Sequence, residues 1–263
     1  MTSYDQEYEY RGMLAETWDL LRGDTSQWQD RFFYRNFINQ QGGRVLDVGC
    51  GTGRLLLDYM KDGIDIEGVD NSPEMLELCR EKANEIGLKP TLYQQTMVDL
   101  DLLQCYQIII VPSSSFQLVI EVEDARKTMG NFFRHLKPGG ILVMPFMLLW
   151  REGTPLDTGW VKDGEKEVPE EGVVTRRWSR AWFDLENQME HTETQFERIE
   201  GGEITLTEYH SRSPATRWYT QLQARELYQV AGFRHLRFFS EFSGEPARAD
   251  DRVFSVVGVK PET

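Results

Sequence analysis

Cysteine is scarce in this chain, which has only Cys50, Cys79 and Cys105 among its 263 residues. An odd number of cysteines without paired spacing argues against a disulfide framework and against a zinc site, and it fits a reducing compartment. With 40% hydrophobic and 27% charged residues, the composition is that of an ordinary globular protein. The length predicts one large domain, or one domain with a sizeable insertion.

Long apolar runs are also missing. No stretch approaches the roughly 20 apolar residues that a membrane-spanning helix requires. The N-terminal stretch, MTSYDQEYEYRGMLAETW, is acidic and aromatic and lacks the basic and apolar regions of a signal peptide. We therefore expect a cytoplasmic protein with no membrane partner.

Positive charge is in deficit. The chain has 29 Lys and Arg residues against 43 Asp and Glu residues, for a net charge of −14. A field of that sign repels a phosphate backbone, whereas proteins that bind nucleic acid usually have the opposite balance. The composition therefore disfavours DNA and RNA as partners.

Strand-like and helix-like stretches alternate along most of the chain. A helical stretch spans residues 13–40. Strand patterns follow at residues 44–48, 64–70, 89–95, 106–111 and 139–146, with helical patterns between them. A last helix begins at Thr220, and two strands close the chain. This alternation predicts an α/β fold with a doubly wound, Rossmann-like, seven-stranded and mostly parallel sheet.

The alternation is interrupted after Trp150. Residues 151–172 are rich in Gly, Pro, Asp and Glu and are expected to form a loop. Three strand-like stretches follow at residues 173–183, 188–199 and 203–213. We therefore expect three parts: an N-terminal helical segment (1–40), a Rossmann-like domain (41–150 and 214–263), and an antiparallel β insertion (151–213) that covers the active site as a lid.

The stretch VLDVGCGTGRLLL, residues 45–57, joins the first strand to the first helix of this sheet. Its glycines at 49, 51 and 53 permit positive φ angles and let the backbone approach a ligand. Asp70 ends the next strand, at the place where a ribose-binding carboxylate is expected. The pattern predicts a nucleotide-like ligand at the carboxyl edge of the sheet.

Two ligands remain open on geometry alone. A dinucleotide requires G-x-G-x-x-G, but Arg54 occupies the third glycine position. Asp47, two residues before the first glycine, suits a ligand that carries an ammonium group and would repel a phosphate. A nicotinamide oxidoreductase is therefore disfavoured.

These residues resemble a known family. LDVGCGTG with Asp70, VDNSPEMLELCREKA and HLKPGGILVM are similar to motifs of the class I S-adenosylmethionine-dependent methyltransferases. The resemblance covers residues 41–150 and 216–260. The insertion, the SSSF after the fourth strand and the AGF after the last helix are more similar to small-molecule methyltransferases, including sugar N-methyltransferases.

The resemblance implies S-adenosyl-L-methionine as cofactor. It implies contacts with the cofactor from Trp18, Asp47, Gly49, Cys50, Gly51, Gly53, Asp70, Asn71, Met75, Met97 and Val98. Asp70 would bind the ribose hydroxyls, and Asp47 would help to hold the α-amino group. Thr96 stands where many relatives have an Asp on the adenine amino group, and Asp99 is a possible substitute.

The resemblance also implies that an aromatic residue of the N-terminal segment closes over the cofactor. Trp18 is the candidate, and Tyr4, Tyr8 and Tyr10 could belong to the same lid. In the insertion, Trp178 and Trp182 share a strand face, which predicts either a small lid core or a wall of the substrate pocket.

The cofactor's methyl group is already activated, so the protein has chiefly to align a nucleophile. Candidate catalytic residues are His210, as a general base, and Ser113 or Ser114, as substrate hydrogen-bond partners; no metal is expected. The predicted reaction is methyl transfer to N or O of a small molecule. A protein or RNA methyltransferase, or a non-catalytic module that binds S-adenosylmethionine, are the alternatives.

Overall fold

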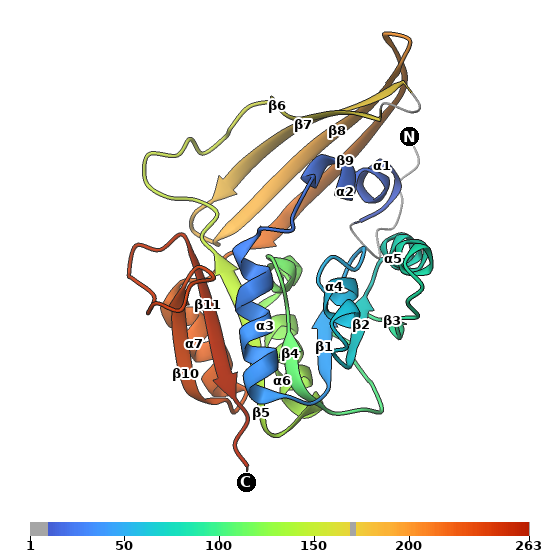
Figure 1. Ribbon diagram of the computed structural model, residues 1–263. Helices are drawn as coiled ribbons and strands as arrows, with labels where there is room; N and C mark the ends of the chain where they lie inside the picture. Colours follow the sequence, from blue (N-terminus) through green and yellow to red (C-terminus); the bar gives the residue numbers. More distant parts are fainter. Residues whose placement is uncertain (1–9, 169–171, 263) are drawn as a thin grey trace.

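The computed structural model describes residues 10–168 and 172–262 (Figure 1). A seven-stranded sheet has the order β10-β11-β5-β4-β1-β2-β3. Its strands are β1 (Val45–Val48), β2 (Ile66–Asp70), β3 (Leu92–Gln94), β4 (Tyr106–Ile110), β5 (Leu136–Met147), β10 (Arg234–Ser240) and β11 (Val253–Val259). Strands β1 to β5 are parallel, and β11 is antiparallel to both of its neighbours. The predicted α/β fold is confirmed.

Helices cover both faces of this sheet. They are α3 (Gln29–Gln41), α4 (Leu56–Lys61), α5 (Pro73–Glu85), α6 (Val122–His135) and α7 (Gln221–Val230), with a 3₁₀ turn η1 (Ser115–Leu118). One core contains side chains of α3, α4 and α5 with Ile108 and Ile110, and the other contains side chains of α6 and α7 with Ile109. Alternate residues of β4 therefore enter opposite cores, as in a doubly wound sheet.

Two helix starts follow the chemistry of their sequences. Ser72 caps α5 by accepting a hydrogen bond from the Met75 amide, and Pro73 occupies the first turn. Thr220 and Gln223 form a reciprocal capping box at the start of α7. These caps fix where the two helices begin relative to the strands before them.

The predicted helix over residues 13–40 is broken in the structure. It consists of α1 (Gly12–Glu16), α2 (Trp18–Arg22) and α3. Gly23 ends α2 with a φ of +69°, and the Asp24 carboxylate accepts a hydrogen bond from the Ser26 amide. Such a local side-chain bond favours a turn over a continued helix.

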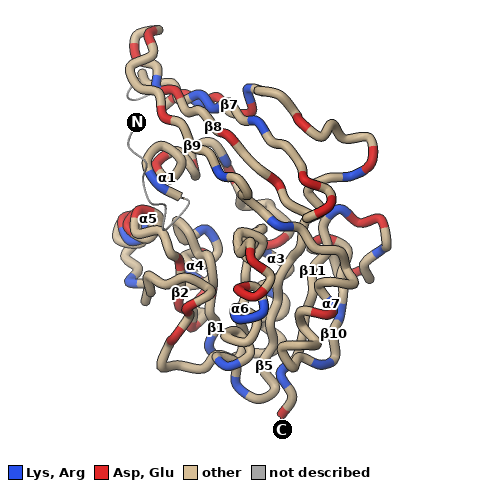
Figure 2. The backbone as a smooth tube through the Cα atoms, turned by 180° about the vertical axis from the view of Figure 1, so that it is seen from behind, with Lys and Arg blue, Asp and Glu red and all other residues tan. Residues whose placement is uncertain are grey.

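The insertion is a four-stranded antiparallel sheet, which we call the lid sheet. Its strands are β6 (Val161–Val168), β7 (Val173–Asp184), β8 (Met189–Glu200) and β9 (Glu203–Arg217). Strand β6 lies where a loop was expected, because its composition is almost wholly polar and its apolar alternation is absent. Cross-strand pairs such as Arg176–Glu165 and Arg177–Asp163 connect β6 to β7, and charges of both signs follow the sheet (Figure 2).

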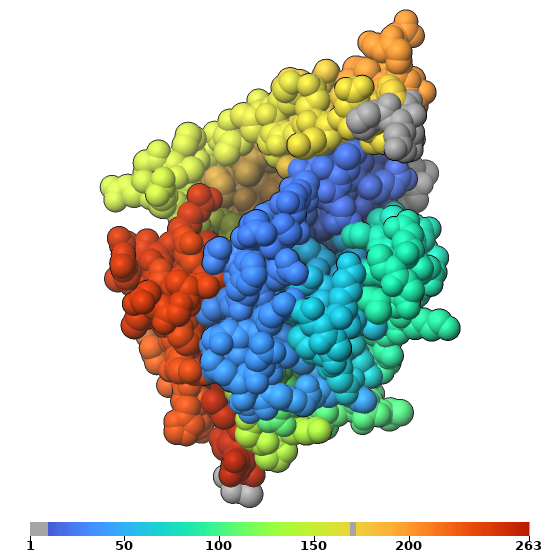
Figure 3. Space-filling model, in the orientation of Figure 1, coloured from blue at the N-terminus to red at the C-terminus, as the bar shows by residue number. Residues whose placement is uncertain are grey.

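The lid sheet lies across the carboxyl ends of β1 and β4 (Figure 1). Helices α1 and α2 lie between this sheet and the glycine-rich loop, and Figure 3 shows them enclosed by the lid above and α5 below. The Glu208 carboxylate on β9 accepts from the Met13 amide at 3.2 Å, and Arg198 on β8 pairs with Glu16. The N-terminal segment is thus attached to the lid sheet.

One buried amide joins the lid sheet to the body. Gln117 in η1 donates to the carbonyls of Met147 and Arg217, both at 3.0 Å, and accepts from the Met147 amide at 2.7 Å. Met147 ends β5, where the chain leaves the body, and Arg217 ends β9, where it returns. None of the described helices is long and apolar enough to cross a membrane.

Candidate functional site

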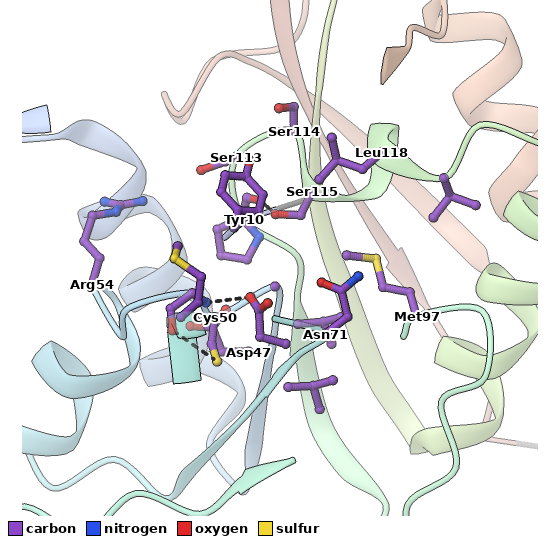
Figure 4. Close-up of a pocket in the computed structure, with 18 of the residues that line it drawn as sticks. Tyr10, Asp47, Cys50, Arg54, Asn71, Met97, Ser113, Ser114, Ser115 and Leu118 are labelled. Atoms are coloured by element: carbon purple, nitrogen blue, oxygen red, sulfur yellow. Dashed lines mark hydrogen bonds between the residues drawn. The ribbon is translucent and has the colours of Figure 1, made fainter. Parts of the chain in front are cut away.

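A cavity of about 1140 Å³ lies at the carboxyl edge of the large sheet. The strand order reverses between β1 and β4, and ligands of such sheets bind at this reversal. The cavity is lined by the loops after β1, β2, β3 and β4, by helix α2 and by residues 211–214 of β9 (Figure 4). The site is thus closed on one side by the lid sheet.

The glycine-rich loop forms the floor of this cavity. Gly49 has a φ of +74°, and a Cβ there would lie 2.7 Å from Ser115 Oγ. Gly53 has a φ of +82°, and a Cβ there would lie 2.6 Å from Cys79 Sγ. Both positions therefore require glycine, the first because of the turn after β4 and the second because of helix α5.

Asp70 ties the loop to the end of β2. Its Oδ2 accepts from the Gly51 amide at 2.8 Å, and its Oδ1 accepts from the Ser72 amide at 2.9 Å. Burial raises the pKa of Asp70, and the hydrogen bonds from Ser72 and Gly51 oppose that shift. The carboxylate is consequently fixed in orientation beside the cavity.

Asp47 is the unusual acid of the site. Its side chain is buried, and Oδ1 has no hydrogen-bond partner among the described residues. Burial raises its pKa to about 7, with Asp70 and Asp30 adding to the shift and Arg54 opposing it. A buried carboxylate without a partner is costly, and a cationic group in the cavity would remove that cost.

Comparison with known proteins agrees with this geometry. Residues 45–140 match the family model of a methyltransferase domain. The chain is 26% identical over 223 residues to a Geobacillus sp. (strain WCH70) protein assigned as a methyltransferase without a stated substrate. That alignment covers 84% of this chain and 87% of the relative.

Two solved structures share the fold. An S-adenosylmethionine-dependent methyltransferase from Clostridium acetobutylicum ATCC 824 has a TM-score of 0.75 at 19% identity, over 92% of this chain and 94% of that one. The sugar N-methyltransferase of Streptoalloteichus sp. ATCC 53650 has a TM-score of 0.72 at 20% identity, over 100% and 98%. Residues 45–140 therefore form a methyltransferase domain, and the chain has the fold of S-adenosylmethionine-dependent methyltransferases.

The methyltransferase cavity fits its cofactor on two independent counts. The unpaired oxygen of Asp47 is available to an ammonium group, and the positive-φ glycines leave space beside Asp70 that a side chain would fill.

The residues predicted for the cofactor line this cavity with one exception. Gly53 does not line it, because its Cα faces Cys79 and Leu57, and its smallness serves the packing of α5 against the loop.

The far end of the cavity is formed by the loop after β3 and by Asn71, which follows β2. Asn71, Thr96, Met97 and Val98 line it, and the Asn131 amide of α6 donates to the carbonyls of Met97 and Val98. Asn131 was not expected from the sequence. Asp99 does not line the cavity. It pairs with Lys127 on the surface and exchanges hydrogen bonds with Thr96.

The turn after β4 carries the three serines to the cavity wall. Ser113 has a φ of +59°, which is uncommon for a residue other than glycine and is frequent at functional sites. Ser115 Oγ donates to the Pro112 carbonyl at 2.8 Å and so holds the turn. Figure 4 shows Ser113 and Ser114 above the glycine-rich loop, near Tyr10.

His210 is not among the residues that line the methyltransferase cavity. Its Nε2 lies 2.6 Å from Glu208 Oε1, and its ring packs edge-on against Phe196. These contacts join β9 to β8 and α1. The structure therefore places the predicted base outside the lining of this cavity.

Trp178 and Trp182 face away from the cavity. Arg177 pairs with Phe196, and Phe196 pairs with Glu208, so these residues share the face that meets α1, and Trp178 occupies the opposite face. Trp182 has the same parity as Trp178 and stacks on His191. Neither tryptophan is among the residues that line the cavity.

A group of cavity residues was missed from the sequence. Trp28 and Asp30 precede and begin α3, Arg22 ends α2, and Arg54 follows the glycine-rich loop. They come together only because the broken N-terminal segment folds back over the loop. Trp18 lines the cavity and packs edge-on against Tyr10 at 4.8 Å, whereas Tyr4 and Tyr8 lie outside the described residues.

Proposed function

We propose that this methyltransferase transfers a methyl group to an amino nitrogen of a small, polar acceptor. The observation that supports this most is a single cavity that joins the glycine-rich loop to the serine turn and to residues 211–214 of the lid sheet. Its volume of about 1140 Å³ exceeds the roughly 300–1,000 Å³ of an ordinary small-ligand pocket. Cofactor and acceptor can therefore lie side by side.

For the cofactor, we assign the ribose hydroxyls to Asp70 and the α-amino group to Asp47. Asp70 is oriented by two backbone amides and keeps unused lone pairs toward the cavity. Met75, Met97 and Val98 supply an apolar surface at the adenosine end, beside the Asn71 amide. Trp18 covers the site from the N-terminal segment.

S-adenosylmethionine, when bound, supplies a methyl group activated by its sulfonium sulfur. The chain's own contribution is positioning and exclusion of water. The turn that holds Ser113 and Ser114 offers hydroxyls to orient an acceptor, and the lid sheet with α2 limits access of solvent. A neutral amine attacks through its own lone pair and releases its proton afterwards, so no strong base is required.

Nitrogen is favoured over oxygen as the acceptor atom by the lining of the cavity. Among the described residues that form it there is no histidine or lysine, and the Ser113 hydroxyl is not paired with a base. A hydroxyl acceptor needs a base near neutral pH, and the candidates that line the cavity are carboxylates such as Glu121 and Asp124, which are weaker bases than histidine. The sugar N-methyltransferase whose structure aligns with 100% of this chain supports an amino sugar as the first acceptor class to test.

The test measures S-adenosylhomocysteine release from S-adenosylmethionine with a panel of small amino sugars, amino acids and matched alcohols. We expect turnover with at least one amine and a product that carries the new methyl group on nitrogen. Turnover with alcohols only would overturn the choice of nitrogen. Cofactor binding without turnover on any panel member, together with methylation of a protein or RNA extract, would overturn the small-molecule proposal.

A further inference from the structure

A second cavity, which we call the α7–β10 pocket, lies at the amino-terminal end of β10, at the end of the large sheet opposite the lid sheet (Figure 1). Its volume is about 360 Å³, and it shares no lining residue with the methyltransferase cavity. Side chains from α7 and from the start of β10 line it: Arg225, Gln229, Phe233, Arg234, His235 and Leu236. None of these lining residues is acidic, whereas the chain has a net charge of −14. The pocket is thus a cationic place on an anionic protein.

A bulge in β10 brings these side chains together. Consecutive residues of a regular strand point to opposite faces, so Arg234 and His235 would not line the same pocket in one. Arg234 pairs with Val259 of β11 and Arg237 pairs with Val257, so β10 has one extra residue in this interval. His235 has a φ of +51°, which is uncommon for a residue other than glycine. Bulges of this kind redirect side chains and are frequent next to functional sites.

The cationic groups of the pocket have no anionic partner in the part of the chain that the structure describes. No carboxylate of residues 10–168 or 172–262 forms an ion pair with Arg225, Arg234 or His235. The lid sheet differs in this respect, because Arg176 and Arg180 each pair with two carboxylates. An anion in the α7–β10 pocket would therefore supply the counter-charge that these groups lack.

Neighbouring groups hold the two arginines of the pocket in place. The Arg225 guanidinium carbon lies 4.5 Å from the ring centroid of Phe238, and such stacking fixes a guanidinium while leaving its N–H edge available. Arg234 donates through one terminal nitrogen to the carbonyls of Phe233 at 2.9 Å and Gln229 at 3.5 Å. These bonds offset the negative end of helix α7 and leave the other two guanidinium nitrogens as donors.

The pocket also has an apolar part. Phe233 is buried, and its ring packs against Phe133 of α6 and against Tyr228, with 5.2 Å between ring centroids in both cases. Leu236 adds a half-buried side chain. Pockets of about 300–1,000 Å³ hold small organic ligands, and an inorganic phosphate would fill only part of this one. The lining therefore fits an anionic group that is attached to a small apolar body.

The set of donors favours a phosphate over a carboxylate. Two guanidinium groups, an imidazole and an amide line the pocket. A phosphate monoester has three terminal oxygens and close to two negative charges, so it can use more of these donors than a carboxylate with two oxygens and one charge.

We propose that the α7–β10 pocket is a second binding site of this protein and takes a small organic phosphate. Arg225 and Arg234 bind the phosphate oxygens, with His235 and Gln229 beside them, and the organic part packs against Phe233. A nucleic-acid backbone is disfavoured, because its further phosphates would meet a protein of net charge −14.

The test measures binding of phenyl phosphate by calorimetry at fixed ionic strength, with and without saturating S-adenosylhomocysteine. We expect saturable one-to-one binding in both conditions, weaker binding of inorganic phosphate, and no binding of phenol. Arg225→Gln should weaken phenyl phosphate by about fivefold to tenfold, because a charged hydrogen-bonded pair is lost at a position that solvent partly screens. Arg225→Lys keeps the charge without the planar fork and should lose less.

Two further variants separate binding in the pocket from general effects of charge and folding. His235→Asn removes the imidazole, and asparagine accepts the left-handed backbone at this position, so affinity should fall without loss of the fold. Arg248→Gln removes the same charge as Arg225→Gln from an exposed position outside both cavities. It should change the affinity for phenyl phosphate by less than about twofold.

Three results would overturn the proposal. The first is the absence of saturable phenyl phosphate binding to the unaltered protein at millimolar concentration. The second is an equal loss in Arg225→Gln and Arg248→Gln, which would show a diffuse attraction to surface charge. The third is binding that S-adenosylhomocysteine abolishes, which would place phenyl phosphate in the methyltransferase cavity. None of these results bears on whether the protein transfers methyl groups, so the two proposals are tested separately.

Discussion

Asp70 and Gly51 are joined by a hydrogen bond of 2.8 Å from the glycine amide to the carboxylate, although one ends a strand and the other lies in the loop after the neighbouring strand. The bond holds the loop at a fixed distance from the end of β2. The Asp70 carboxylate therefore has two roles, to position the glycine-rich loop and to contact a ligand in the cavity. Mutations can separate these roles.

The first prediction concerns Asp70→Asn. The amide keeps one acceptor oxygen, so either the Gly51 or the Ser72 amide loses its acceptor, and the charge beside the cavity is lost. Loss of charged hydrogen bonds of about 1.5–3 kcal/mol each should lower affinity for S-adenosylhomocysteine at least tenfold. Calorimetry measures this, with Asp99→Asn as a control that lies outside the cavity. Equal affinities in the two variants would exclude a ribose contact at Asp70.

The second prediction concerns Gly51→Val. Gly51 has a φ of +53° and lines the cavity, so a β-branched side chain is strained and occupies ligand space. We expect loss of measurable S-adenosylhomocysteine binding in a protein that still folds. Gly63→Val is the matched control, since Gly63 has a φ of +78° with open space around its Cα. If both variants bind alike, the cofactor does not lie over Gly51.

The third prediction is a pH dependence caused by Asp47. Its pKa is about 7 in the folded protein and 3.8 without the fold. The folded state therefore holds a proton that the unfolded state releases. The resulting penalty is absent below pH 4, grows as the pH rises and is complete above pH 7, at on the order of 4 kcal/mol at most.

Asp47→Asn should remove that penalty. Urea unfolding of the ligand-free protein should show the variant more stable than the unaltered protein at pH 8, by more than at pH 5. The same variant should bind S-adenosylmethionine more weakly. A stability difference that is independent of pH would show that Asp47 is ionised throughout this range.

The fourth prediction concerns the lid sheet. Replacing residues 151–213 by a Gly-Ser bridge leaves Met147 and Arg217 in place for Gln117 and leaves the glycine-rich loop intact. We expect affinity for S-adenosylhomocysteine to fall by no more than several-fold, through loss of the Glu208 contact to α1, and acceptor methylation to be lost. Retained methylation of the native acceptor would show that the lid sheet does not select it.

The fifth prediction concerns Gln117→Leu. The change leaves two carbonyls and one amide of the main chain without their partner in a buried place. At about 1–3 kcal/mol for each unsatisfied group, the free energy of unfolding should fall by about 3 kcal/mol or more. Gln41→Leu, at an exposed position with one bond, should change it by less than about 0.5 kcal/mol. Chemical denaturation would compare the two.

Local patterns in the sequence were enough to predict the large sheet and its loop. Buried parallel strands such as β4 are continuous apolar runs, and Gly49 to Gly53 with Asp70 lie on one βαβ unit, so neighbours in space are also near in sequence. The contact between Arg22 and the indole of Trp28 spans a turn, and the pair of Arg54 with Asp30 spans a strand and a helix. No periodicity encodes such contacts.

Strand β6 was mispredicted, and the role of the two faces of β7 was left open, for a related reason. The β6 sequence VKDGEKEV is polar on both faces, so it lacks the alternation that marks a half-buried strand. For Trp178 the alternation was visible, but parity alone does not say which face meets the body. The contact between the Glu208 carboxylate and the Met13 amide determines which face meets the body. Glu208 lies on β9, which is three strands away from β6 in the lid sheet.

Gln117 has a consequence for protein engineering. The Gln117 side chain hydrogen-bonds to the main chain both where the chain leaves the body, at Met147, and where it returns, at Arg217. The lid sheet and the serine turn are therefore held together and are expected to move as one rigid part. A chimera that carries the lid sheet of a relative must keep the main-chain register at Met147 and Arg217. Otherwise the relative's 3₁₀ turn must be transferred together with its lid sheet. A splice one residue off at either end would turn a carbonyl away from this amide and shift Ser113 and Ser114 along with it.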